Sequence, residues 1–152
     1  YGIPFNKAGV NLTAPPANNV IITSELDEIL TGEMLGDGCI TWGDGKRKEL
    51  SRSAQFTYCT AKVGYLKWLY RLLATHGLEM SGSFNERVTP PTRHSNGLYT
   101  LRDTVSHKAR TRSYIELRDY RVKWYDNDGV KHPPIDLVIT PTVLRHWFIG
   151  DE

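Results

Sequence analysis

Apolar positions along the chain recur at helical spacing in some segments and alternate with polar ones in others. The helical spacing predicts helices over residues 25–36, 62–76 and 113–125 and from 141 onward. Strand-like segments cover residues 39–42, 52–59, 83–89 and 98–105, and in the second of them Ala54, Phe56 and Tyr58 alternate with polar residues. The predicted order is therefore helix, two strands, helix, two strands, helix, and one further helix.

Capping residues and glycines mark the ends and faces of these helices. Ser24 is the predicted N-cap of the first helix, and Thr140 is that of the last, whose first position is Pro141. Gly32 and Gly36 lie four residues apart on one face of the first helix. Each costs about 1 kcal/mol of helix propensity relative to Ala, a loss that close approach of another backbone would offset. We therefore expect this face to pack against another helix.

Composition and charge restrict the kind of protein. With 152 residues and 39% hydrophobic residues, the chain fits one domain of ordinary size. The net charge of +2 conceals a segregation: residues 1–45 have a balance of −5, residues 46–123 of +10 and residues 124–152 of −3. The basic middle segment indicates a polyanionic partner. No apolar run approaches the roughly 20 residues that cross a membrane, and two cysteines with no visible secretion signal favour an intracellular protein. Cys59 is expected to be a small buried strand residue.

Two nine-residue segments, 30–38 and 144–152, share Leu at the first position and Gly-Asp at the seventh and eighth. Each places an acid, Asp37 or Asp151, at the carboxyl end of a helix, where the helix dipole disfavours an anion. A divalent cation would reverse that preference, since Mg²⁺ takes carboxylate and carbonyl oxygens as ligands. If the two helices pack in parallel, the acids can share metal for in-line attack of water on a phosphodiester. An ordinary turn after the first helix is the alternative interpretation.

These residues resemble the LAGLIDADG homing endonucleases, and in particular their intron-encoded branch. The motif itself matches residues 30–38, and further similarity lies in the segments 52–56, 62–70, 124–133 and 137–147. The resemblance implies an α+β fold in which an αββαββα unit with a curved four-stranded antiparallel sheet is used twice. It divides the chain into an extended arm over 1–23, one complete unit over 24–139, and the second motif helix over 140–152. Glu152 stands where the second motif has glycine.

The resemblance also implies an activity and the residues that carry it. Asp37 and Asp151 match the metal-binding acids, and the carbonyls of Gly36 and Gly150 match backbone ligands for Mg²⁺, with Mn²⁺ or Ca²⁺ able to occupy the same site. Lys131 matches a basic residue near the active centre, although a solvent-exposed turn lysine is an equal alternative. The implied function is site-specific cleavage of both strands of double-stranded DNA, which promotes intron mobility. A complementary half or a second copy would complete the enzyme.

The candidate DNA-binding residues are basic or polar and lie on the predicted sheet and its loops. They are Lys46, Arg47, Lys48, Arg52, Ser53, Gln55, Thr57, Asn85, Arg87, Arg93, Thr100, Arg102 and Thr104. An ordinary solvated sheet face remains the simpler interpretation of any one of them. Two other functions remain open: a non-cleaving nucleic-acid-binding module, such as an RNA maturase relative or a degenerate half, and a structural domain that dimerises through its glycine-bearing helix.

Overall fold

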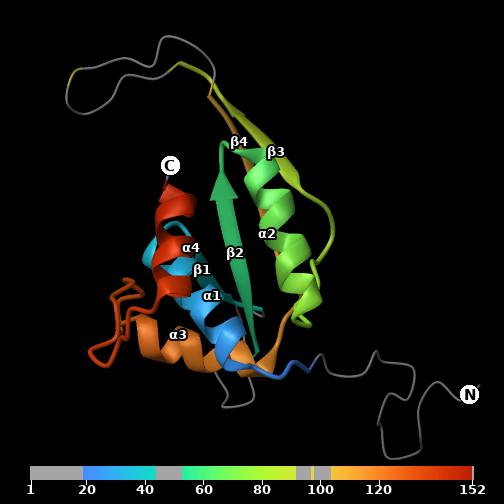
Figure 1. The fold of residues 1–152 in the computed structure, drawn as a ribbon. Helices are drawn as coiled ribbons and strands as arrows, with labels where there is room; N and C mark the ends of the chain where they lie inside the picture. The colour runs from blue at the N-terminus through green and yellow to red at the C-terminus, as the bar shows by residue number, and fades with distance from the viewer. Residues whose placement is uncertain (1–18, 44–52, 92–96, 98–103, 152) are drawn as a thin grey trace, which may run out of the picture.

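The computed structural model describes residues 19–43, 53–91, 97 and 104–151, and every structural statement below refers to that part of the chain. In chain order the elements are α1 (Ser24–Leu35), β1 (Cys39–Trp42), β2 (Ala54–Thr60), α2 (Val63–Thr75), β3 (Asn85–Thr89), β4 (Thr104–Arg110), the 3₁₀ helix η1 (Ile115–Leu117), α3 (Arg118–Trp124) and α4 (Pro141–Asp151). The predicted α+β order of elements is confirmed (Figure 1).

Three boundaries differ from those predicted. Thr23, not Ser24, caps α1, because Thr23 has an extended backbone and its side chain accepts a hydrogen bond from the Leu26 N–H at 3.2 Å. The fourth strand, predicted over 98–105, continues to Arg110, and its predicted residues 98–103 lie outside the described part of the chain. The third helix begins as the 3₁₀ turn η1, because Tyr114 before it is extended and pairs with Ala54 of β2.

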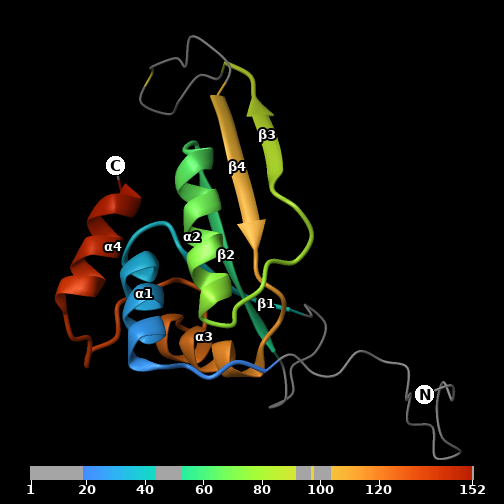
Figure 2. The same ribbon diagram turned by 45° about the vertical axis from the view of Figure 1, so that its right-hand side comes forward.

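The four strands form one antiparallel sheet in the order β1-β2-β4-β3. The register pairs Ile40 with Phe56 between β1 and β2, and Tyr58 with Ala109 between β2 and β4. The far end of the β3–β4 hairpin extends beyond α2 in both views (Figures 1 and 2), so Val88 and Val105 are exposed there. The hairpin is therefore covered by helices over only part of its length.

The core lies between the sheet and the helices that cover one of its faces (Figure 2). The sheet contributes Ile40, Phe56 and Tyr58, and α1 contributes Leu26, Leu30 and Met34, all of them fully buried. The amphipathic pattern of α2 buries Leu66, Leu69 and Leu73 against the same sheet face. No helix in the described residues is long and apolar enough to span a membrane. One face of the sheet is thus fixed by packing against helices, whereas Asn85, Arg87 and Lys108 on the other face are exposed.

Candidate functional site

Helices α1 and α4 lie side by side and run in the same direction, so their carboxyl ends lie at the same end of the pair (Figures 1 and 2). Gly32 is at their closest approach. A Cβ atom at this position would lie 2.5 Å from the carbonyl oxygen of Val143 and 2.6 Å from the Cβ of His146. Both distances are shorter than van der Waals contact, so the absence of a side chain at residue 32 permits this packing. The propensity cost of this glycine is offset by the contact between the helices.

The first motif ends in a tight turn that leaves its acid at the surface. Helix α1 ends at Leu35, and the N–H groups of Gly36 and Gly38 both donate to the carbonyl oxygen of Glu33, at 3.1 Å and 2.8 Å. Asp37, between these two glycines, is exposed. Asp151 is the last residue of α4, but its side chain, like Glu152, lies outside the described part of the structure. One Gly-Asp sequence therefore follows the carboxyl end of α1, and the other forms the carboxyl end of the parallel helix α4.

Lys131 contacts the end of α1 directly. Its Nζ donates to the carbonyl oxygen of Gly36 at 2.8 Å and to that of Gly38 at 2.7 Å, and the residue is only partly exposed. The structure therefore places Lys131 beside Asp37 and does not place it as a free turn lysine. The carboxyl end of a helix favours a positive charge, and here an ammonium group supplies one.

The residues at this end of α1 suit a metal ion. Carboxylate and carbonyl oxygens are the donors that hard divalent cations take, and the carbonyls of Gly36 and Gly38 already accept bonds from a cation, the Lys131 ammonium. Within the described residues no cluster of three or more His, Cys, Asp or Glu side chains is found. Asp37 and the Gly36 carbonyl are thus the oxygen donors that α1 could offer to a metal ion.

A short loop holds Lys131 in this position. Its backbone pairs with Tyr125, and the carboxylate of Asp126 closes the loop. Asp126 Oδ1 accepts from the N–H groups of Asp128 and Val130, both at 2.9 Å, and Oδ2 lies 2.8 Å from Nε2 of His132. These bonds, that from Val130 first among them, hold the pKa of the Asp126 carboxyl below its ordinary value of 3.8. Asp126 thus fixes the loop that presents Lys131.

The hydrogen bonds of Asp126 predict that the loop carrying Lys131 is sensitive to acid. Because folding lowers the pKa of Asp126, the hydrogen bonds of its carboxylate stabilise the folded loop above about pH 4. This stabilisation is lost as the pH falls through the lowered pKa. In a carbon-13 NMR titration, we expect the Asp126 carboxyl to titrate below 3.8, together with the amide shifts of Val130. The Asp126→Asn variant should remove that transition from the Val130 amide. A Val130 amide that shifts identically in both proteins would contradict the assignment.

The sheet face opposite the core carries a polar and basic set of side chains. Strand register brings Gln55, Asn85, Arg87 and Thr104 to that face, together with Lys108, which pairs with Asn85, and Arg110, which pairs with Thr57. Lys108 and Arg110 were not predicted, but each lies directly across from a predicted residue on a neighbouring strand. Ser53 is partly exposed and precedes β2. The remaining predicted DNA-binding residues lie outside the described residues: Lys46, Arg47, Lys48, Arg52, Arg93, Thr100 and Arg102.

Two positions on this face differ from expectation. Thr57 is buried, at 8% exposure, and its hydroxyl lies 3.3 Å from that of Thr41, which leaves it little surface for a base edge. Cys59 is exposed and not buried, because it lies on the sheet face opposite the core, paired with Lys108. Alternation along β2 identified the correct faces, but the burial of single residues depends on their cross-strand neighbours.

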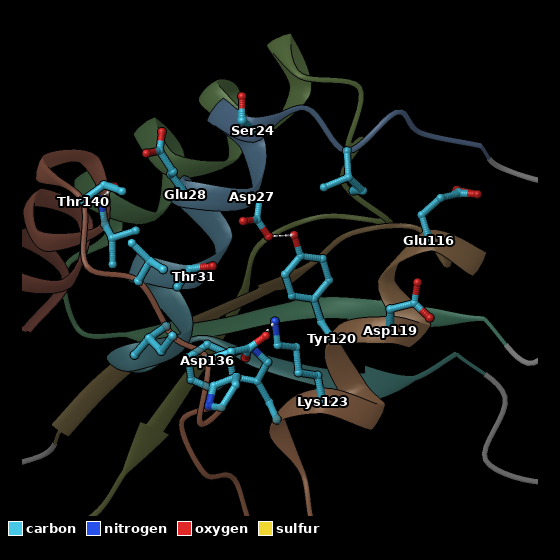
Figure 3. Close-up of a pocket in the computed structure, with 16 residues that line it drawn as sticks. Ser24, Asp27, Glu28, Thr31, Glu116, Asp119, Tyr120, Lys123, Asp136 and Thr140 are labelled. Atoms are coloured by element: carbon cyan, nitrogen blue, oxygen red, sulfur yellow. Dashed lines mark hydrogen bonds and ion pairs between the residues drawn. The ribbon is translucent and has the colours of Figure 1, made fainter.

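A cavity of about 500 Å³ opens elsewhere, between the first half of α1, α3 and the segment that leads to α4 (Figure 3). Acids dominate its polar lining: Asp27, Glu28, Glu116, Asp119 and Asp136. Tyr120 donates to Asp27, and the Nζ of Lys123 lies 3.2 Å from Asp136. Asp37 and Lys131 are not in the lining. A surface with this charge repels phosphate.

Sequence reasoning missed a buried pair between the two helices. Glu33 of α1 and His146 of α4 are 1% and 4% exposed, and Glu33 Oε2 lies 2.7 Å from His146 Nδ1. The available signal was an acid on the apolar side of α1, next to Met34 and one turn after Leu30. Its partner is 113 residues away in the sequence, so the pairing could not be read from local spacing.

A comparison with solved structures identifies the fold. Its structure is similar to that described as the homing endonuclease I-WcaI bound to its DNA recognition sequence, with a TM-score of 0.60 and 18% sequence identity, over 84% of this chain and 51% of that one. The chain thus spans about half the length of that relative, and at this identity the similarity shows the fold. No curated protein sequence gives a significant match.

The family follows from the sequence match. The model of the LAGLIDADG DNA endonuclease family matches residues 27–151, which covers most of α1, the sheet and α4. The chain belongs to this family.

Proposed function

We propose that this chain is part of a site-specific homing endonuclease that hydrolyses both strands of DNA at the carboxyl ends of α1 and α4. The observation that supports this most is the parallel packing of the two motif helices through Gly32, which brings both Gly-Asp ends to one side of the pair. The proposal requires Asp37 and Asp151 to approach the same scissile region.

The roles of the residues follow from their chemistry. Asp37 and Asp151, with the carbonyls of Gly36 and Gly150, would hold Mg²⁺, or Mn²⁺ or Ca²⁺ in its place. Such an ion activates water and stabilises the charge that develops on a phosphodiester. Lys131 holds its ammonium beside Asp37 through two carbonyl bonds, where it would stabilise a phosphate oxygen or hold a water. The sheet face with Gln55, Asn85 and Arg87 would lie in the major groove.

Since the chain covers 51% of the length of its structural relative, we propose that a second unit completes the enzyme. That unit would supply a second sheet for the other half of the DNA site. It can belong to the same longer protein, to a separate complementary chain, or to a second copy. In each case the second unit must leave the contact between α1 and α4 intact.

Cleavage of a duplex library tests the proposal. The chain, alone and with any protein that copurifies with it, is incubated with randomised double-stranded DNA and Mg²⁺, and the cut ends are sequenced. We expect staggered cuts at one preferred sequence, and none when EDTA removes the metal. If no duplex is cut but DNA or intron RNA is bound with steep salt dependence, the chain is a non-cleaving nucleic-acid-binding module.

Lys108 provides a test of the DNA-facing surface. Lys108 is exposed and pairs with Asn85 in the sheet, so we expect it to neutralise a phosphate. Lys108→Ala should weaken binding to specific and non-specific duplexes alike, and should reduce the slope of log affinity against log salt by about 0.9. Lys123→Ala is the matched control, because Lys123 lies in the acidic cavity and pairs with Asp136. Equal slopes for both variants would place the DNA on another surface.

A further inference from the structure

The buried polar contacts between α1 and α4 have no part in the chemistry proposed above. Glu33 Oε2 accepts from the hydroxyl of Tyr65 and lies 2.7 Å from His146 Nδ1. Burial and the nearby Glu33 carboxylate raise the pKa of Tyr65 well above its ordinary value of 10.0, so its hydroxyl remains a donor. Burying a carboxylate is costly unless it is paired, and in some proteins such pairs fix one arrangement among several. Because burial of Glu33 is costly without its partner, the Glu33–His146 pair favours one way of packing α4 against α1.

The same contacts surround the last turn of α4. The ring of Trp68 stacks on that of His146, with centroids 5.8 Å apart at 19°. Tyr58 of β2 donates its hydroxyl hydrogen to the carbonyl oxygen of Gly150 at 3.2 Å. A Cβ at residue 150 would lie 2.8 Å from the Tyr58 hydroxyl oxygen and 3.1 Å from Glu33 Oε1. Side chains of α1, β2 and α2 therefore hold the end of α4 in one place.

The contact is also specific for α4. Gly32 and His146 both occupy the third position of their nine-residue segments, and the two residues lie directly opposite each other. A second copy of α1 in place of α4 would bring glycine to the position of His146. Glu33 would then lose His146 and keep only the Tyr65 hydroxyl as a donor while remaining buried, so part of the cost of burying its charge would no longer be offset. The pair thus favours α4 over another α1 as the partner of α1.

We propose that Glu33, His146 and Tyr58 are positioning residues that set the register of α4 against α1, and so bring the Gly150-Asp151 end level with Asp37. The catalytic consequence rests on the function proposed above, but the register itself can be measured without cleavage. A carbonyl oxygen has two lone pairs, so the bond from Tyr58 orients the Gly150 carbonyl and leaves one pair for another ligand.

Distance measurements between spin labels test the register. Cys39 and Cys59, both exposed, are replaced by Ser, and nitroxide labels are attached at the exposed positions Glu25 and Arg145. The labelled protein with His146 is compared with two variants. His146→Leu loses the Nδ1–H donor to Glu33, whereas the side-chain amide of His146→Asn can donate from the position of Nδ1. We expect one narrow distance distribution for the unaltered network and for His146→Asn, and a broadened or shifted one for His146→Leu.

Cleavage kinetics give the second measurement. Misplacement of a catalytic group by about 1 Å can cost on the order of 10²-fold in rate. We therefore expect kcat to fall by about that factor in His146→Leu with little change in KM, and to be largely restored in His146→Asn. Tyr58→Phe removes one hydroxyl from a buried ring and is the second variant in case His146→Leu does not fold. It should lower kcat about tenfold and speed amide exchange in the last turn of α4.

The possible outcomes separate this inference from the proposed function. Identical label distances in all the proteins would overturn the inference, as would a displaced α4 that leaves kcat unchanged. If the unaltered protein cuts no duplex, the proposed function is wrong, and the label distances alone decide whether the network sets the register.

Discussion

Asp37→Asn should lower the rate of DNA cleavage by about 10³-fold or more. The substitution preserves the size of the side chain but removes the charge that α1 offers to a metal at its carboxyl end. A bound metal contributes several kcal/mol of transition-state stabilisation, and each 1.36 kcal/mol corresponds to a factor of ten in rate. The measurement is single-turnover cleavage of the preferred duplex, in the same assembly in which the wild-type chain is active.

Binding and a matched control distinguish this effect from misfolding. Asp37 is exposed, so the variant should unfold at the same temperature as the wild type and bind the duplex at least as tightly in Ca²⁺, because one repulsion between carboxylate and phosphate is removed. Asp136→Asn is the control, since Asp136 is also exposed but lies in the acidic cavity, paired with Lys123. Cleavage by Asp37→Asn at the rate of the control would show that Asp37 holds no essential metal.

The sequence predicted those elements whose apolar pattern is strong. The apolar spacing of α1 and α2, and the alternation along β2, reflect burial against a single core, so periodicity identified them. The end of the fourth strand was predicted too early, at residue 105, because residues 104–110 bury only Ala109. Pairing with β2 and β3 defines that strand, and local pattern does not. The choice between Thr23 and Ser24 as the cap of α1 depended on where the extended backbone ends.

The part of the candidate site that could be predicted from the sequence is the part at the ends of the two motif helices. Two Gly-Asp pairs and the propensity cost of Gly32 indicated a pair of parallel helices with acids at one end. The bonds from Lys131 to Gly36 and Gly38 cross 95 and 93 residues of sequence, and only the resemblance to a family pointed to that lysine. No role was predicted from the sequence for Glu33, which is buried and held by Tyr65 and His146.

Gly32→Ala should detach or displace α4, although alanine is the better helix former. The added methyl would have to occupy space 2.5 Å from the Val143 carbonyl oxygen and 2.6 Å from the His146 Cβ. Overpacking of this kind typically costs 1–3 kcal/mol, which exceeds the gain of about 1 kcal/mol in helix propensity. We expect hydrogen exchange of the α4 amides to accelerate by about tenfold or more, and cleavage to fall with it.

Gly64→Ala is the matched control for this prediction. Gly64 is an exposed glycine in the first turn of α2, and a Cβ there would meet nothing within 4 Å. The same substitution at this position should leave α4 exchange and cleavage unchanged, and should stabilise the protein by up to about 1 kcal/mol. If neither variant changes hydrogen exchange of the α4 amides, α1 and α4 can accommodate a methyl group at residue 32, and close packing there does not hold them together. If only Gly32→Ala releases α4, a single missing methyl group determines whether the two motif helices can pair.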